Sequence, residues 1–126
     1  GHIQGDECLK EVANIAKSVV FDESVFVARY GGEEFGILLP RANQYEAIKM
    51  AEAIRQQVEG RGIVHQASEV FKCVTISVGI MTVVPSENIQ PISIVHQADL
   101  ALYEAKRTGR NRISVYSHHK EADSNV

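Results

Sequence analysis

Two adjacent carboxylates in an apolar neighbourhood are the residues of this sequence that first suggest chemistry. The stretch VFVARYGGEEFGILLP, residues 25–40, places Gly31, Gly32, Glu33 and Glu34 between runs rich in Val, Phe, Ile and Leu. Side chains alternate along an extended strand, so the two glutamates point to opposite faces at the end of a turn. Carboxylate oxygens suit Mg²⁺, which often bridges to substrate phosphates. The residues alone leave open both a cation site and a solvated acidic turn.

Three further polar residues lie near the ends of predicted helices. Asp6, in GHIQGD, can N-cap the first helix or accept hydrogen bonds from the N–H groups of guanine. Lys106 and Arg110 lie in ADLALYEAKRTGRNR, residues 98–112. Two cations near a helix C-terminus can compensate the helix dipole or hold a triphosphate. Spacing alone favours the structural role for this pair.

Hydrophobic periodicity predicts the elements that must position these residues. Helices are expected over residues 5–20, 44–59 and 92–107, and strands over residues 25–30, 35–40, 71–82 and 112–116. The glycine pair predicts a hairpin between the first two strands. Asn43 is expected to cap the second helix at its start and Gly60 to end it, and Val95 is expected to face inward on the third. The order predicts an α+β domain with helices packed on an antiparallel-rich sheet.

Length and composition fit one domain with a real core. The chain has 126 residues, of which 44% are hydrophobic and 23% charged. Its formal net charge of −3 gives no broad polyanion-binding face, so no nucleic-acid partner is expected. The sequence contains neither an apolar run of membrane-spanning length nor a signal-peptide pattern, which predicts a cytoplasmic domain without direct membrane contact. Cys8 and Cys73 lie within apolar patterns and are therefore expected to be reduced core residues. No metal or redox role is expected for them, because no CxxC or Cys/His spacing is present.

Four motifs in order resemble those of one family. RYGGEEF resembles the GGDEF/GGEEF signature of diguanylate cyclases, and GHIQGD resembles their GHxxGD element. TISVGI, residues 75–80, is similar to their SxGI strand, and ADLALYEAKRTGRNR to their closing ADxALYxAKxxGRN helix. The resemblance implies a nucleotidyl-cyclase-like palm fold with a ferredoxin-like core. It also implies that two GTP molecules are condensed into cyclic di-GMP with release of two pyrophosphates.

The resemblance assigns roles to the residues of the GGEEF turn. It implies that Glu33 is a ligand of Mg²⁺ or Mn²⁺ and that Glu34 acts near the reacting ribose and the metal. The backbone of Gly31 and Gly32 matches the glycines that approach the nucleotide. Both glutamates are therefore expected to be catalytic.

The resemblance also assigns the nucleotide contacts. Asp6 matches the residue that hydrogen-bonds guanine, and Lys106 and Arg110 match the cations on the terminal phosphates. Each domain holds one GTP and half of the reaction, so catalysis is expected to need a homodimer. Such domains are usually fused to N-terminal sensory or receiver modules, and one is expected in the parent protein.

One departure from the family concerns the start of the sequence. The family's domain normally begins earlier, with a strand and a segment that supplies another metal-binding Asp. The GGDEF domain is therefore expected over residues 1–116, without its first strand and part of its first helix, followed by a polar tail over residues 117–126. The isolated 126-residue piece is expected to be inactive although its parent is an active cyclase.

A second departure concerns product inhibition. Many members carry an RxxD site before the signature, but Asp22 and Val25 occupy those positions here, and Ala53 replaces an assisting arginine. No product inhibition through this site is expected.

The alternative function from a different class is an inactive GGDEF domain that binds GTP as a regulatory or dimerisation module.

Overall fold

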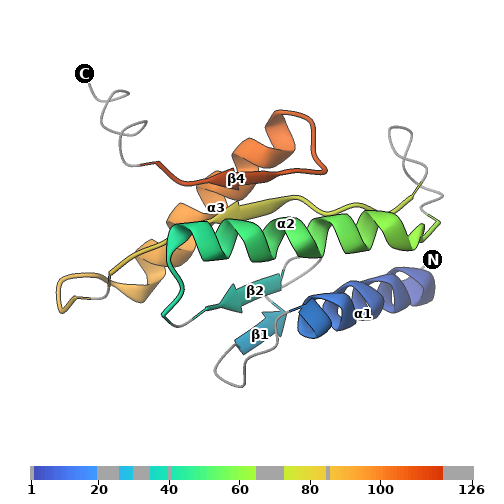
Figure 1. Cartoon of the computed structure of the whole chain (residues 1–126), viewed down its shortest axis with the longest axis horizontal. Helices are drawn as coiled ribbons and strands as arrows, with labels where there is room; N and C mark the ends of the chain where they lie inside the picture. The colour runs from blue at the N-terminus through green and yellow to red at the C-terminus, as the bar shows by residue number, and fades with distance from the viewer. Residues whose placement is uncertain are drawn as a thin grey trace. The chain divides into compact units, whose positions relative to one another are not determined.

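Three helices and four strands alternate along the described part of the chain in this computed structural model. The structure describes residues 2–19, 26–29, 35–39, 41–64, 73–84 and 86–117, and of residues 2–6, 26–29 and 35 the backbone alone. Figure 1 shows, in chain order, α1 (His2–Val19), β1 (Phe26–Arg29), β2 (Phe35–Leu38), α2 (Gln44–Arg61), β3 (Val78–Ile80), α3 (Pro91–Arg107) and β4 (Ile113–Val115). The predicted order of helices and strands is confirmed.

The chain divides into two units, Gly1–Ile76 and Ser77–Val126, and the first is built around α1 and α2. The two helices meet through a cluster of buried aliphatic side chains: Val12, Ile15, Ala16, Ile54 and Val58. Full burial of one such Val or Ile is worth about 1.5–3 kcal/mol. The helical spacing of apolar residues, which predicted both helices, therefore also identifies what holds the unit together.

A hairpin carries the connection in which the GGEEF turn lies. β1 pairs with β2 antiparallel, with Phe26 opposite Leu38 and Arg29 opposite Phe35. This register confirms the predicted hairpin and leaves residues 30–34 as the connection between the two strands.

Helix α2 begins as predicted and ends two residues later than predicted. The Asn43 side chain accepts a hydrogen bond from the Glu46 N–H at 2.8 Å. Gly62, not Gly60, caps the C-terminus, with φ 67° and its N–H donating to the Glu59 carbonyl at 3.2 Å. A left-handed C-terminal residue favours glycine, and of these two glycines only Gly62 adopts that conformation, so the expectation for Gly60 is wrong.

The second unit places two strands on helix α3. β3 pairs with β4 in parallel, with Val78 opposite Ile113 and Ile80 opposite Val115, and α3 packs on both. Parallel strands need a crossover, and α3 provides it. The described strand pairs are thus one antiparallel and one parallel, and the sequence did not predict the parallel pair.

Of the strand predicted over residues 71–82 the structure describes residues 73–82, and within them the strand is much shorter. Only Val78–Ile80 forms β3, because β4 offers a partner of three residues. Cys73 instead forms an isolated antiparallel bridge with Val64, in the first unit.

Val95 does not face inward as predicted, since it is 38% exposed. Three-residue strands span about 10 Å, whereas the 17 residues of α3 rise about 25 Å, so part of the helix extends past its partners. The buried contacts of α3 lie at Ala101 and Ala105.

No helix in the described ranges combines the length and apolar character needed to span a bilayer.

Gly79 fixes how closely β3 approaches α3. A Cβ at this position would lie 2.8 Å from the Leu102 Cα, and closer still to the Leu102 nitrogen and the Ala98 oxygen. These are backbone atoms of a helix, so they cannot move aside as a flexible side chain would. The strand therefore lies directly on the helix backbone.

We expect Gly79→Ala to lower the free energy of unfolding by about 1–3 kcal/mol, the usual cost of overpacking. Urea denaturation followed by circular dichroism measures the change. The matched control is Gly60→Ala, because a Cβ there meets nothing within 4 Å. This helical substitution should raise stability by about 0.5–1 kcal/mol. Equal stabilities for Gly79→Ala and the unchanged protein would contradict the close approach.

Candidate functional site

The four residues of the predicted catalytic turn lie outside the described residues. Gly31, Gly32, Glu33 and Glu34 all belong to the connection between β1 and β2. Asp22 and Val25, at the positions of the product-inhibition motif, also lie outside, whereas Ala53 is half-buried on α2. What the structure fixes for the catalytic turn is the pairing of the two strands that it joins.

Asp6 lies within α1 and not at its start. The helix begins at His2, and no acidic residue occupies its first turn. An N-cap residue precedes the helix that it caps, so N-capping is not the role of Asp6. The assignment of Asp6 to guanine stays a prediction.

Lys106 and Arg110 lie at one end of α3, where the chain leaves the helix towards β4. We call residues 108–112 the exit turn. Lys106 is in the last helical turn, and the Arg110 N–H donates to the Ala105 carbonyl at 3.0 Å. This bond closes a Schellman-type C-terminus, with Gly109 at φ 137° in the position that favours glycine. The structure therefore brings the backbone of Arg110 back to the helix turn that carries Lys106.

The exit turn has an unusual backbone. Arg110 (φ 63°) and Asn111 (φ 46°) follow Gly109, so three consecutive residues have positive φ. A left-handed conformation costs a non-glycine residue about 1–2 kcal/mol. Such conformations persist only where the surroundings enforce them, and they cluster at functional sites.

Basic side chains dominate this end of α3. Residues 104–112 contain four basic residues and one acidic residue: Lys106, Arg107, Arg110, Arg112 and Glu104. The Arg107 Nε donates to the Glu104 carboxylate at 3.1 Å, and this hydrogen bond raises the pKa of Arg107. The single carboxylate is thus engaged by Arg107, and the local excess of positive charge favours an anion.

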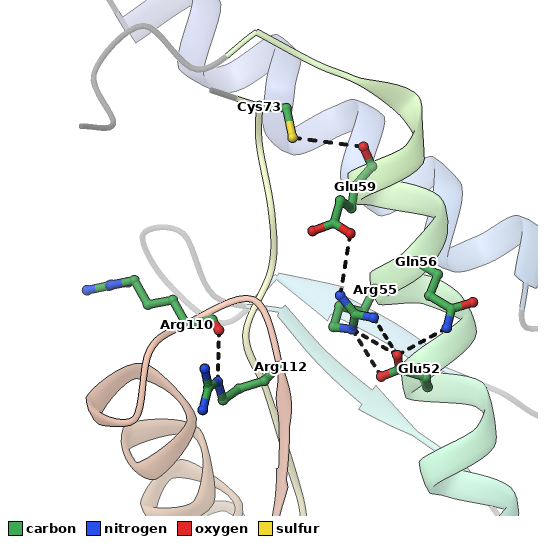
Figure 2. A network of polar contacts seen from close by, with 7 residues as sticks. All are labelled: Glu52, Arg55, Gln56, Glu59, Cys73, Arg110 and Arg112. Carbon is green, nitrogen blue, oxygen red and sulfur yellow. Dashed lines mark hydrogen bonds and ion pairs between the residues drawn. The ribbon is translucent and has the colours of Figure 1, made fainter. Parts of the chain in front are cut away.

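Arg112 is a residue that the sequence analysis missed. Its Nε donates to the Arg110 carbonyl at 3.0 Å, and both arginines are exposed (Figure 2). The only feature of the sequence that points to Arg112 is its place as the last arginine of GRNR. The spacing of residues in this motif does not predict that the Arg112 side chain folds back on the turn.

A second polar network, also missed, lies on the surface of α2 in the first unit (Figure 2). The Arg55 Nε donates to both Glu52 carboxylate oxygens at 3.0 and 3.1 Å, and Gln56 donates to the same carboxylate at 3.2 Å. A longer ion pair of 3.9 Å joins Arg55 to Glu59. The hydrogen bond from Arg55 lowers the pKa of Glu52 and raises that of Arg55. The i,i+3 and i,i+4 spacing identifies a helix-surface network with a structural role.

No metal cluster appears in the part of the chain that the structure describes, where no three His, Cys, Asp or Glu side chains come together. The residues predicted to hold a metal, Glu33 above all, are outside it. Their adjacent carboxylates are of the donor type that hard divalent cations take.

Comparisons with known proteins agree with the four motifs. A family model described as "Diguanylate cyclase, GGDEF domain" matches residues 1–112. Diguanylate cyclase A of Treponema denticola is 42% identical over 118 residues, which cover 91% of this chain and 30% of that protein. Probable diguanylate cyclase DgcT of Escherichia coli is 44% identical over 117 residues, covering 91% and 25%. The chain thus spans about a quarter to a third of the length of these two relatives.

Solved structures agree as well. The active GGEEF domain of a diguanylate cyclase from Vibrio cholerae superposes with a TM-score of 0.80 and 34% identity, over 94% of this chain and 72% of that one. The GGDEF domain of DgcB from Caulobacter crescentus, solved in complex with c-di-GMP, gives 0.78 and 32%, over 92% and 67%. The predicted α+β palm fold is confirmed by these likenesses.

The α2 network generates a pH-dependent prediction. The pKa of Glu52 is lowered from its ordinary 4.5, so the network stabilises the fold above that pH and loses its effect as the pH falls through the lowered pKa. Because the Glu52 side chain is 35% exposed, the effect should stay below about 1 kcal/mol. We expect Glu52→Gln to be less stable than the unchanged protein at pH 7, and the difference to shrink as the pH falls below 4.5 towards 3.

Urea denaturation across this pH range provides the measurement. Glu87→Gln, which removes an exposed carboxylate between β3 and α3, is the control. A stability difference that stays constant down to pH 3 would show that the Glu52 charge does not stabilise the helix surface.

Proposed function

The chain belongs to the diguanylate cyclase GGDEF domain family, and from that membership we propose that it condenses two GTP molecules into cyclic di-GMP with release of two pyrophosphates. The observation that carries this proposal is the exit turn, where Arg110 is held at a basic helix end in a chain that keeps GGEEF intact. Phosphoryl transfer depends on positioning the nucleotide and neutralising its charge.

Lys106 and Arg110 bind the terminal phosphates in this proposal. A helix C-terminus is the negative end of the dipole, so the phosphates gain nothing from the backbone of α3. The cationic side chains must supply the attraction, and an arginine forms two parallel hydrogen bonds to a phosphate. The four basic residues around one carboxylate support this role.

Glu33 and Glu34 perform the chemistry in this proposal. Glu33 holds a divalent cation, Mg²⁺ or Mn²⁺, and the cation supplies neutralisation of charge on phosphate oxygens. Glu34 acts next to the reacting ribose. Gly31 and Gly32 leave room for the nucleotide to approach the backbone. Asp6 accepts hydrogen bonds from guanine and so selects GTP over ATP.

Two such domains must meet for the reaction. One domain binds one GTP, and the 3′-hydroxyl of each nucleotide attacks the α-phosphate of the other, so the active form is a homodimer. The GGDEF domain extends over residues 1–116 and the polar tail over residues 117–126. It acts in the cytoplasm, where GTP is available, under the control of an N-terminal sensory or receiver domain.

The first test is Glu34→Gln in the full-length protein. We expect cyclic di-GMP production to fall about 10²-fold or more, with GTP affinity within a few-fold of the original, because the change removes a catalytic carboxylate and keeps its size. Liquid chromatography of the product and equilibrium binding of GTP give the two readouts. Glu87→Gln is the control. An unchanged protein that binds GTP without forming cyclic di-GMP would instead support the regulatory alternative.

The second test is Arg110→Ala, measured with GTP and with GMP. Loss of one charge-assisted contact of about 1.5–3 kcal/mol should weaken GTP binding about 10- to 100-fold. GMP lacks the terminal phosphates, so its affinity should not change. Arg107→Lys is the matched control, because it keeps the positive charge that is paired with Glu104 at the same helix end. Equal losses for the two nucleotides would contradict the assignment of Arg110 to the terminal phosphates.

A further inference from the structure

We propose that Arg112 is a positioning residue that holds Arg110 in its phosphate-binding conformation. The inference rests on the proposed role of Arg110 at the terminal phosphates and adds to it a residue that has no assigned role. It is carried by the contacts of the exit turn.

Both peptide groups that flank the Arg110 Cα are held. On the helix side, the Arg110 N–H donates to the Ala105 carbonyl at 3.0 Å. On the other side, the Arg110 carbonyl accepts from the Arg112 Nε at 3.0 Å. The direction in which a side chain leaves the backbone depends on these two groups. Arg112 therefore supplies one of the two restraints on Arg110.

The guanidinium of Arg112 also occupies the space beside Gly109. A Cβ at Gly109 would lie 3.0 Å from the Arg112 Cζ and closer still to one of its terminal nitrogens. The missing side chain at Gly109 thus makes room for the guanidinium that restrains the next residue. Figure 2 shows the Arg112 side chain reaching the Arg110 carbonyl while the Arg110 side chain extends away.

Arg112 is itself anchored to the sheet. Its carbonyl accepts from the Val78 N–H at 2.9 Å, and β4 begins at the next residue. The side chain consequently links a fixed point on the β3–β4 pair to the turn. Such a link helps to explain why Arg110 keeps a positive φ, which arginine does not adopt readily.

Charge alone does not explain this arrangement. Lysine keeps the positive charge but has no donor at the Nε position of a planar guanidinium. If Arg112 acts by positioning, Arg112→Lys should behave as a loss of function. If Arg112 only adds to the local potential, Arg112→Lys should bind GTP like the unchanged protein.

The experiment is a double-mutant cycle on nucleotide affinity in the full-length protein, with Arg110→Ala, Arg112→Lys and both together. We expect Arg112→Lys to weaken GTP binding about threefold to tenfold, the effect of one ordinary hydrogen bond, and to leave GMP binding unchanged. In the Arg110→Ala background it should have no further effect, because it acts through Arg110. Arg107→Lys, the matched control, should bind GTP normally.

Amide hydrogen exchange without nucleotide tests the conformational part separately. The Arg110 N–H should exchange about threefold to tenfold faster in Arg112→Lys, while the amides of α2, in the other unit, stay unchanged. Unchanged exchange, or a GTP effect that persists in the Arg110→Ala background, would overturn the positioning role. Normal GTP binding by Arg110→Ala would refute the proposed function of Arg110, and the link to phosphate binding with it.

Discussion

The contact of the Gly79 backbone with α3 is the constraint on which the second unit depends. Because position 79 has no side chain, β3 lies directly on the helix at Ala98 and Leu102. The distance between β3 and α3 also fixes the position of β4, the parallel partner of β3. It therefore fixes the span that the chain must cross between the end of α3 and Arg112, where the hydrogen bonds to β3 begin. A larger residue would move the strand outwards and change the span that the exit turn has to bridge.

The exit turn is a consequence of this short span. Helix α3 ends at Arg107, and the Arg112 carbonyl already pairs with Val78, so only residues 108–111 reverse the chain. Extended or helical residues would carry the chain past the strand, and left-handed residues turn it back within this length.

The first unit is held differently, by aliphatic burial between α1 and α2 and by caps at both ends of α2.

The sequence predicted the elements better than their ends. Periodicity located the three helices, the hairpin and the Asn43 cap, since these depend on local spacing. It failed where the structure of an element depends on a partner that is distant in the sequence. β3 is only as long as its partner β4, and Val95 is exposed because α3 extends beyond the two strands. The motif resemblance proposed Lys106 and Arg110, but no pattern indicates that the Arg112 side chain folds back onto a carbonyl.

That carbonyl matters for the proposed chemistry. An anion bound beyond the C-terminus of α3 meets the negative end of the helix dipole and the oxygen atoms of the turn. In the exit turn the Ala105 carbonyl accepts from the Arg110 N–H, and the Arg110 carbonyl accepts from Arg112. Both oxygens are thereby occupied by donors, and their repulsion of a phosphate falls. The same hydrogen bonds that orient Arg110 thus reduce the effect of the partial negative charge on these oxygens. Both the orientation of Arg110 and the electrostatics of the turn therefore favour a phosphate bound to Arg110.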